Sequence, residues 1–249
     1  MKKFTKYILF ISLGLLCSCS DYLDIVPDNV TTLDIVFNNK NTAQRYLANC
    51  YHFVPDHGSV KRIPGMGAGH ECWFYTDKDS YFDNEVSFYI ARGLQNTNAP
   101  YANYWDGEGG SKLPMFRAIR ECNIFLSYVR DQHKVNDLTD SERKRWIAEV
   151  NVLKAYYHFF LFEHYGPIPI VDEALPVSTS SEGVKVTRMP VDQVVDFMVK
   201  LIDDSYKDLP PVITMEATEM GRLTQPAALQ NPIMGSQSSL QWQQGVCKL

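Results

Sequence analysis

The sequence has no excess of positive charge. Its 249 residues include 24 Lys and Arg against 29 Asp and Glu, which gives a formal net charge of -5. Proteins that bind nucleic acid neutralise its phosphates with clustered basic side chains, and no basic stripe runs along this chain. The charge balance therefore argues against a nucleic-acid partner. A hydrophobic content of 45% is ordinary for a folded globular protein.

The cysteines and histidines lack the spacing of a metal or redox site. Among the histidines, His158 and His164 are six positions apart and so do not share a helical face, while His70 lacks the second histidine of an H-E-x-x-H motif. We therefore expect no metal and no cofactor. Buried free thiols are the expected state of the later cysteines, although export would permit disulfides. The cysteines after the signal peptide and lipobox include no pair at C-x-x-C spacing; they are Cys50, Cys72, Cys122 and Cys247.

The N-terminal apolar run is too short to cross a bilayer as a mature helix. It covers residues 7–16 and follows three lysines, which is typical of a secretory signal peptide. The next residues, Leu-Cys-Ser-Cys, resemble a bacterial lipobox with cleavage before Cys19 and lipid on its sulfur; Cys17 is a second choice, and an ordinary signal peptide is the alternative. We expect a lipoprotein signal peptide over residues 1–18 and a lipidated tether and lead-in over residues 19–38, anchored by acyl chains such as palmitate.

The most strongly patterned stretch is residues 139–171. Thr139 and Glu142 form a T-x-x-E capping box, and Gly166 supplies a left-handed stop. Between them, apolar residues recur at helical spacing and widen until little of the second half is polar. A helix that is apolar nearly all round is usually buried between other helices, so we expect a central strut. Its extended exit, residues 167–171, should run across the domain surface.

Three further helices are predicted around this strut. Apolar stripes at helical spacing mark residues 41–53, 112–129 and 190–209. The helices form antiparallel-looking pairs, which favours tetratricopeptide-like stacking, although no clean 34-residue repeat is visible. The predicted fold is mostly α, with tetratricopeptide-like helix pairs, long irregular aromatic loops and an incomplete C-terminus.

The aromatic region 70–108 is where a binding function can be argued from chemistry. A sugar ring has an apolar face and a rim of hydroxyls, so its site needs an exposed aromatic platform beside planar polar partners. The alternative is that these aromatics anchor long loops to the core. The glycan-binding candidates are Trp73, Tyr75, Tyr101, Asn103, Tyr104, Trp105 and Asp106.

Other chemistries find weaker support. The GMGAG of residues 65–69 has no strand before it or helix after it, as a phosphate loop requires. Glycosidases need two opposed carboxylates, and no spacing singles out a pair among the loop acids between 77 and 108. We expect no catalytic residue, with a polysaccharide-degrading enzyme as the alternative. The aromatics of the central helix are expected to be core: Tyr156, Tyr157, Phe159, Phe160 and Tyr165.

Four pieces of the chain resemble the N-terminal half of the SusD/RagB family. They are the lipobox with CSDYLDIVPDN, the helix NTAQRYLANCYHFVP, the segment YWDGEGGSKLPMFRAIRECNIFL, and EVNVLKAYYHFFLFEHYGPIPIV with its follower RMPVDQVVDFMVKLIDDSYKDLP. The resemblance implies a surface-exposed lipoprotein of the cell outer membrane that is not an enzyme. It implies that the protein captures oligosaccharides for import by a SusC-like TonB-dependent transporter, its partner.

The resemblance is lost after Leu229. Residues 39–229 are identified as a SusD-like N-terminal helical domain, while residues 230–249 form an aberrant tail without a helical stripe, expected to be disordered. A family member would continue with another helix and a further half. A frameshift near Leu229 is one hypothesis, which resequencing tests, and a non-functional truncated fragment is an alternative to the binding function.

Overall fold

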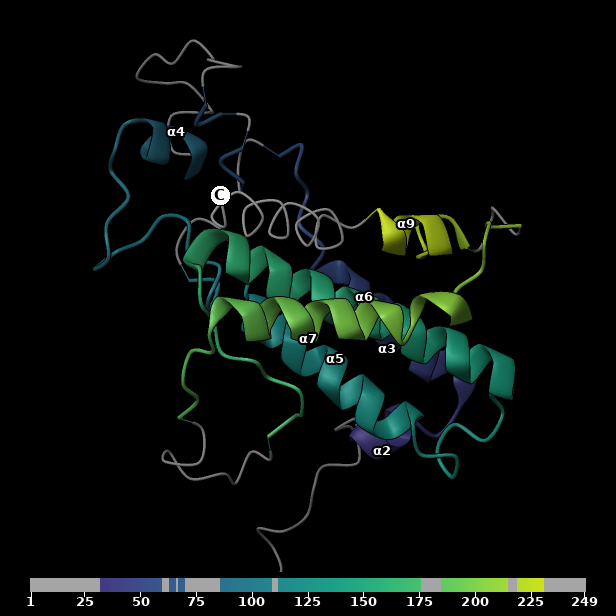
Figure 1. The fold of residues 1–249 in the computed structure, drawn as a ribbon. Helices are drawn as coiled ribbons and strands as arrows, with labels where there is room; N and C mark the ends of the chain where they lie inside the picture. Colours follow the sequence, from purple (N-terminus) through teal and green to yellow (C-terminus); the bar gives the residue numbers. More distant parts are fainter. Residues whose placement is uncertain are drawn as a thin grey trace, which may run out of the picture. The chain divides into compact units, whose positions relative to one another are not determined.

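The computed structural model describes residues 32–59, 63–65, 67–69, 86–108, 112–175, 185–214 and 219–230 (Figure 1). Helix accounts for 53% of the structure, and the described residues contain no strand, so the prediction of a mostly α fold is confirmed. No described helix combines the length and apolar character that a bilayer crossing needs. The signal peptide, Cys19, Trp73, Tyr75 and the C-terminal tail lie outside the described residues.

Two compact units divide the chain, residues 1–36 and 37–249. In the first unit, the described part is the four-residue helix α2 (Leu33–Val36). The second unit contains the remaining described helices. They are α3 (Lys40–His52), α4 (Val86–Ala91), α5 (Met115–Val129), α6 (Asp140–Tyr165), α7 (Val191–Asp203), the 3-10 turn η2 (Tyr206–Asp208) and α9 (Gln225–Leu229).

Helix α6 is the central element of the second unit, as the sequence predicts. Its capping box is formed: Thr139 Oγ1 accepts from the N–H of Glu142 at 3.3 Å, and Glu142 Oε2 accepts from the N–H of Thr139 at 3.2 Å. Gly166 ends the helix with a φ of 68°, where only glycine is free of strain. Helices α3, α5 and α7 all pack on α6, and Figure 1 shows α5 and α7 running beside it.

The boundaries of two helices differ from the prediction for local reasons. The helix expected from residue 112 begins at Met115, because Lys112 adopts a φ of 51° and Pro114 has extended backbone. The helix expected up to residue 209 ends at Asp203, and η2 replaces its last turn. There, the Ser205 hydroxyl turns inward and accepts from Asn151 Nδ2 of α6 at 3.0 Å.

The exit from α6, expected to run across the domain surface, is partly buried. Ile168 is fully buried, and its carbonyl accepts from the N–H of Met189 at 3.0 Å. The buried ammonium of Lys154 on α6 bonds the Asp172 carboxylate at 2.5 Å and the Asp172 carbonyl at 2.7 Å. This ion pair and the burial of Ile168 hold the exit against the helix.

Charged groups inside the core have defined structural partners. The buried guanidinium of Arg143 donates to four main-chain carbonyls in the connection between α5 and α6, those of Val129, Asp131, Lys134 and Val135, at 2.6–3.2 Å. Val135 has a left-handed φ of 50°. Since bonds to a charged donor are stronger than neutral ones, we expect Arg143 to stabilise this connection between the two helices.

Candidate functional site

The glycan-binding candidates that the structure describes follow α4 in the chain, on residues 101–106. The same run contains residues with opposite environments, because Tyr104 is fully buried while its neighbours Asn103 and Trp105 are half-buried and Asp106 is exposed.

Tyr104 is part of the core. Its exposed fraction is 0%, and its ring packs edge-on against Phe160 (centroids 4.9 Å apart) and His164 (4.6 Å). Its N–H donates to the hydroxyl of Tyr165 at 2.8 Å, and its carbonyl accepts from Met115 at 3.0 Å. Burial raises the pKa of the Tyr104 hydroxyl above its usual value. The ring offers no open face, which corrects the expectation of a sugar platform and makes Tyr104 the core anchor of its loop.

Asn103 and Asp106 shape the turn that carries Trp105. Asn103 Nδ2 donates to Asp106 Oδ1 at 2.6 Å, and Asn103 Oδ1 accepts from the N–H of Trp105 at 3.2 Å. Asp106 Oδ1 also accepts from the N–H of Glu108 at 2.9 Å. Gly107 completes the turn with a φ of 80°, and an added Cβ would lie 2.7 Å from Pro114. The two polar side chains therefore hold the turn that carries Trp105.

Trp105 is the half-buried centre of a small surface cluster. Its indole lies 4.6 Å from the ring of Phe116 and 5.5 Å from that of Tyr165, between ring centroids. The guanidinium carbon of Arg188 lies 5.3 Å from the indole centroid, within cation–π range. We call Trp105, Phe116, Tyr165 and Arg188 the Trp105 cluster. The sequence placed Tyr165 in the core and did not single out Arg188, because the cluster joins three segments that are distant in sequence.

Tyr101 forms a separate aromatic pair with Tyr89 of α4. The rings are stacked, with centroids 3.9 Å apart and planes inclined by 6°. Gln95 Oε1 accepts from the N–H groups of Tyr101 and Ala102, at 2.8 and 3.2 Å, which holds Tyr101 in the stack. Tyr89 therefore covers one face of the Tyr101 ring. The spacing of the two residues in the sequence did not predict this stack.

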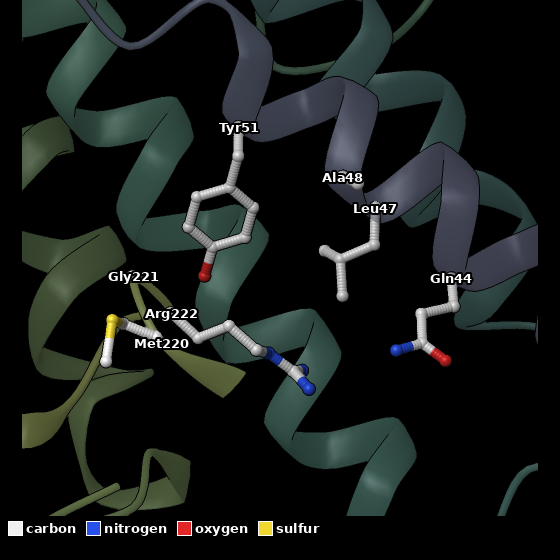
Figure 2. Close-up of a pocket in the computed structure, with 7 residues that line it drawn as sticks. All are labelled: Gln44, Leu47, Ala48, Tyr51, Met220, Gly221 and Arg222. Atoms are coloured by element: carbon white, nitrogen blue, oxygen red, sulfur yellow. The ribbon is translucent and has the colours of Figure 1, made fainter. Parts of the chain in front are cut away.

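Two adjacent hollows lie where α3, α6 and residues 220–230 meet. The first, of about 260 Å³, is lined by Gln44, Leu47, Ala48, Tyr51, Met220, Gly221 and Arg222. Figure 2 shows Tyr51 and Leu47 projecting from α3 toward Arg222 and Met220. The second, of about 280 Å³, shares Tyr51 and Gly221 with the first. No sequence motif predicted these hollows, because residues that line them are more than 170 positions apart.

A buried ionic network lies beside the first hollow. Glu149 of α6 has no exposed side-chain surface; its carboxylate accepts from Arg145 Nε at 3.0 Å, Arg222 Nη2 at 2.8 Å and the Tyr51 hydroxyl at 2.7 Å. Glu219 binds the same two arginines, at 2.8 and 3.3 Å. Burial, reinforced by Glu149, raises the pKa of the Tyr51 hydroxyl. Two acids balance two bases, so Arg222 serves the fold and is not an open anion site.

The described residues contain no group of three His, Cys, Asp or Glu side chains placed to hold a metal ion. Asp106 and Glu108 sit on one turn and do not oppose each other across a cleft, as the carboxylates of a glycosidase must. The acids at positions 77, 79, 83 and 85 lie outside the described residues.

Comparison with known proteins identifies the family. A family model described as "SusD-like_3: Starch-binding associating with outer membrane" matches residues 21–231. The chain belongs to the SusD-like family. Among curated proteins, the SusD-like protein P38 of Formosa agariphila is 22% identical over 218 residues, which cover 84% of this chain and 39% of that protein.

Solved structures share the fold of this SusD-like chain. A laminarin-binding SusD-like protein superposes with a TM-score of 0.62 at 16% identity, covering 82% of this chain and 42% of that one. Surface glycan-binding protein A from Bacteroides uniformis gives a TM-score of 0.54 at 20% identity, covering 76% and 39%. The helical, tetratricopeptide-like fold is thereby confirmed. The SusD-like chain spans less than half the length of each of these relatives.

Proposed function

We propose that this SusD-like protein captures an oligosaccharide at the cell surface, with Trp105 as an aromatic platform. The observation that carries the proposal is the Trp105 cluster, where a half-buried indole is held by a tight turn beside the side chains of Asn103 and Asp106. A sugar ring needs this combination: an aromatic plane for its C–H face and planar polar groups for its hydroxyls. Relatives described as laminarin-binding and glycan-binding support the ligand class.

Arg188 regulates access to the indole in this proposal. Its guanidinium carbon lies 5.3 Å from the indole centroid, and the same side chain donates to the carbonyls of Tyr165 and Pro167, at 3.3 and 3.1 Å. A cation–π contact at an exposed site contributes only about 0.5–1 kcal/mol. A stacked sugar can therefore replace it, while the guanidinium turns to bond the sugar hydroxyls.

The wider proposal follows the family. The chain is anchored through lipid on Cys19 in the outer membrane, faces the outside, and passes its oligosaccharide to a SusC-like TonB-dependent transporter for import. Trp73 and Tyr75, with Tyr101, would extend the platform beyond the Trp105 cluster. We propose that the protein acts by binding alone, without hydrolysing the glycan. The outer-membrane description of the matching family supports this location.

Affinity gel electrophoresis of the full chain tests the binding. Gels containing laminarin, starch or another soluble glucan should retard the wild-type protein on at least one of them. Trp105→Ala should reduce that retardation at least about fivefold, since a ligand ring stacked on an aromatic side chain contributes about 1–3 kcal/mol. Tyr206→Ala, which removes a half-exposed aromatic on η2 outside the cluster, is the matched control. Equal retardation of wild type and Trp105→Ala would contradict the role of Trp105.

A further inference from the structure

Two buried cysteines lie on the packed helices α3 and α5. Cys50 lies on the buried face of α3, and Cys122 lies on that of α5. The adjoining turns are in contact: the ring of Tyr46 lies 6.4 Å from that of Phe125, and the Tyr46 hydroxyl donates to Glu121 at 2.5 Å. Cys50 is one of the groups that raise the pKa of the Cys122 thiol. Together with the contacts of the adjoining turns, this places the two cysteines in one part of the core, although 72 positions separate them in sequence.

The surroundings of the pair keep the thiols apart from solvent. Both cysteines are free and have an exposed fraction of 0%. The hydroxyl of Tyr157 on α6 donates to the carbonyl of Cys50 at 2.5 Å, which places α6 beside the pair. Burial, followed by the neighbouring thiol, raises the pKa of Cys122. A protonated, enclosed thiol reacts slowly, so the thiols must react while the chain folds or opens.

We propose that Cys50 and Cys122 form a disulfide that links α3 to α5 when the chain folds in an oxidising compartment. One thiolate attacks an external disulfide, either oxidised glutathione or the active-site disulfide of a dithiol oxidase, and forms a mixed disulfide. The second thiolate then displaces the donor's sulfur. The chain loses two protons and two electrons, and the donor is reduced to two thiols. The sulfurs must approach to about 2.05 Å, and α3 and α5, which carry them, are already packed against each other.

The link would restrain the part of the chain that carries the proposed platform. Every glycan-binding candidate, from Trp73 to Asp106, lies between the two cysteines in sequence. Closing so long a loop lowers the entropy of the unfolded chain more than closing a short one. The disulfide is independent of the glycan proposal, since it depends on the packing of α3 and α5 alone.

Disulfide mapping tests the link. The full chain is refolded in reduced and oxidised glutathione, alkylated in denaturant, digested with trypsin and analysed by mass spectrometry. We expect a cross-linked species of residues 46–61 and 121–130, lighter by two hydrogens than the two peptides together. Recovery of both peptides fully alkylated, or joined to peptides of Cys72 or Cys247, would overturn the proposal. If refolding fails, disulfide mapping of the chain recovered from a bacterial periplasm tests whether the Cys50–Cys122 link forms.

Thermal melts of matched variants give a second readout. Reductant should lower the melting temperature of the oxidised wild type and of Cys247→Ser by several degrees, since both keep the link. It should leave Cys122→Ala unchanged, because that variant cannot form it. An equal response to reductant in wild type and Cys122→Ala would show that the pair forms no structural disulfide.

Discussion

His158 is a neutral imidazole held inside the core between α6, α7 and the chain that leaves α6. Its Nδ1 lies 2.7 Å from the carbonyl of Lys154 and therefore carries the proton; its Nε2 accepts from the N–H of Val171 at 3.4 Å. The ring of Phe197 on α7 packs edge-on at 5.1 Å. Burial lowers the pKa of His158 from 6.5 to about 4. A proton on Nε2 would displace the Val171 bond and leave a buried charge.

This histidine predicts a loss of stability in mild acid. Between pH 6.5 and 4 the unfolded chain binds a proton that the native chain excludes, so the free energy of unfolding falls as pH falls, by up to about 3 kcal/mol. Urea unfolding at pH 7.5, 6.5, 5.5 and 4.5 measures it. His158→Gln should be less stable at pH 7.5 but flatter across this range, while the exposed His52→Gln should follow wild type. Identical pH profiles for wild type and His158→Gln would contradict the assignment.

Tyr104 and Trp105 show the limit of sequence reasoning at this scale. The sequence identifies a run of aromatic and polar residues suited to sugars, and chemistry alone treats both aromatics alike. Tyr104 is nevertheless anchored under Tyr165 and Phe160, whereas Trp105 points to the half-open cluster beside Arg188. The difference depends on contacts with residues about 60 and 80 positions away, which no local pattern contains.

Elements with local causes are predicted well from the sequence. The start and end of α6 follow from Thr139, Glu142 and Gly166, because a capping box and a left-handed glycine act within a few residues. The start of α5 and the end of α7 were missed, since Lys112 takes a left-handed backbone and Ser205 turns to Asn151 of α6. The end of α7 depends on a tertiary contact, which no local pattern in the sequence indicates.

The connection between α5 and α6 carries a prediction about Arg143. Arg143→Met should lower the free energy of unfolding by about 3 kcal/mol, because it leaves four main-chain carbonyls without their charged donor. Lys144→Met, at the exposed neighbouring position, is the control and should change it by less than about 0.5 kcal/mol. Urea denaturation measures both. A loss for Arg143→Met no larger than the control would show that the guanidinium does not fix the connection.

At the scale of the whole molecule, the sequence predicted the class and the family better than the site. Helical periodicity and four family-like pieces indicated a mostly α SusD-like chain, and both were confirmed. The hollows beside Tyr51 and the network on Glu149 were not predicted, because residues 219–222 meet α3 and α6 only in the folded chain. Sequence patterns predict features that depend on a single helix, and they do not predict sites that form where three distant segments meet.

Membrane attachment is a prediction for the whole protein. In cells fed a clickable palmitate analogue, the wild-type chain should carry label and sediment with outer membranes, because acyl chains on Cys19 hold it there. Cys19→Ala should lose the label and the sedimentation, whereas Cys17→Ala should keep both. Label retained in Cys19→Ala would contradict the lipid anchor on that cysteine.

Isothermal titration of the purified full chain with oligosaccharides of laminarin and of starch is the direct test of glycan binding at Trp105. We expect saturable heat for at least one of them, with an affinity that Trp105→Ala lowers at least about fivefold and Tyr206→Ala leaves unchanged. Circular dichroism should show the same helical content for all three proteins. Binding that persists undiminished in Trp105→Ala, or a folded wild type that binds no glucan or other glycan of a broad panel, would contradict it.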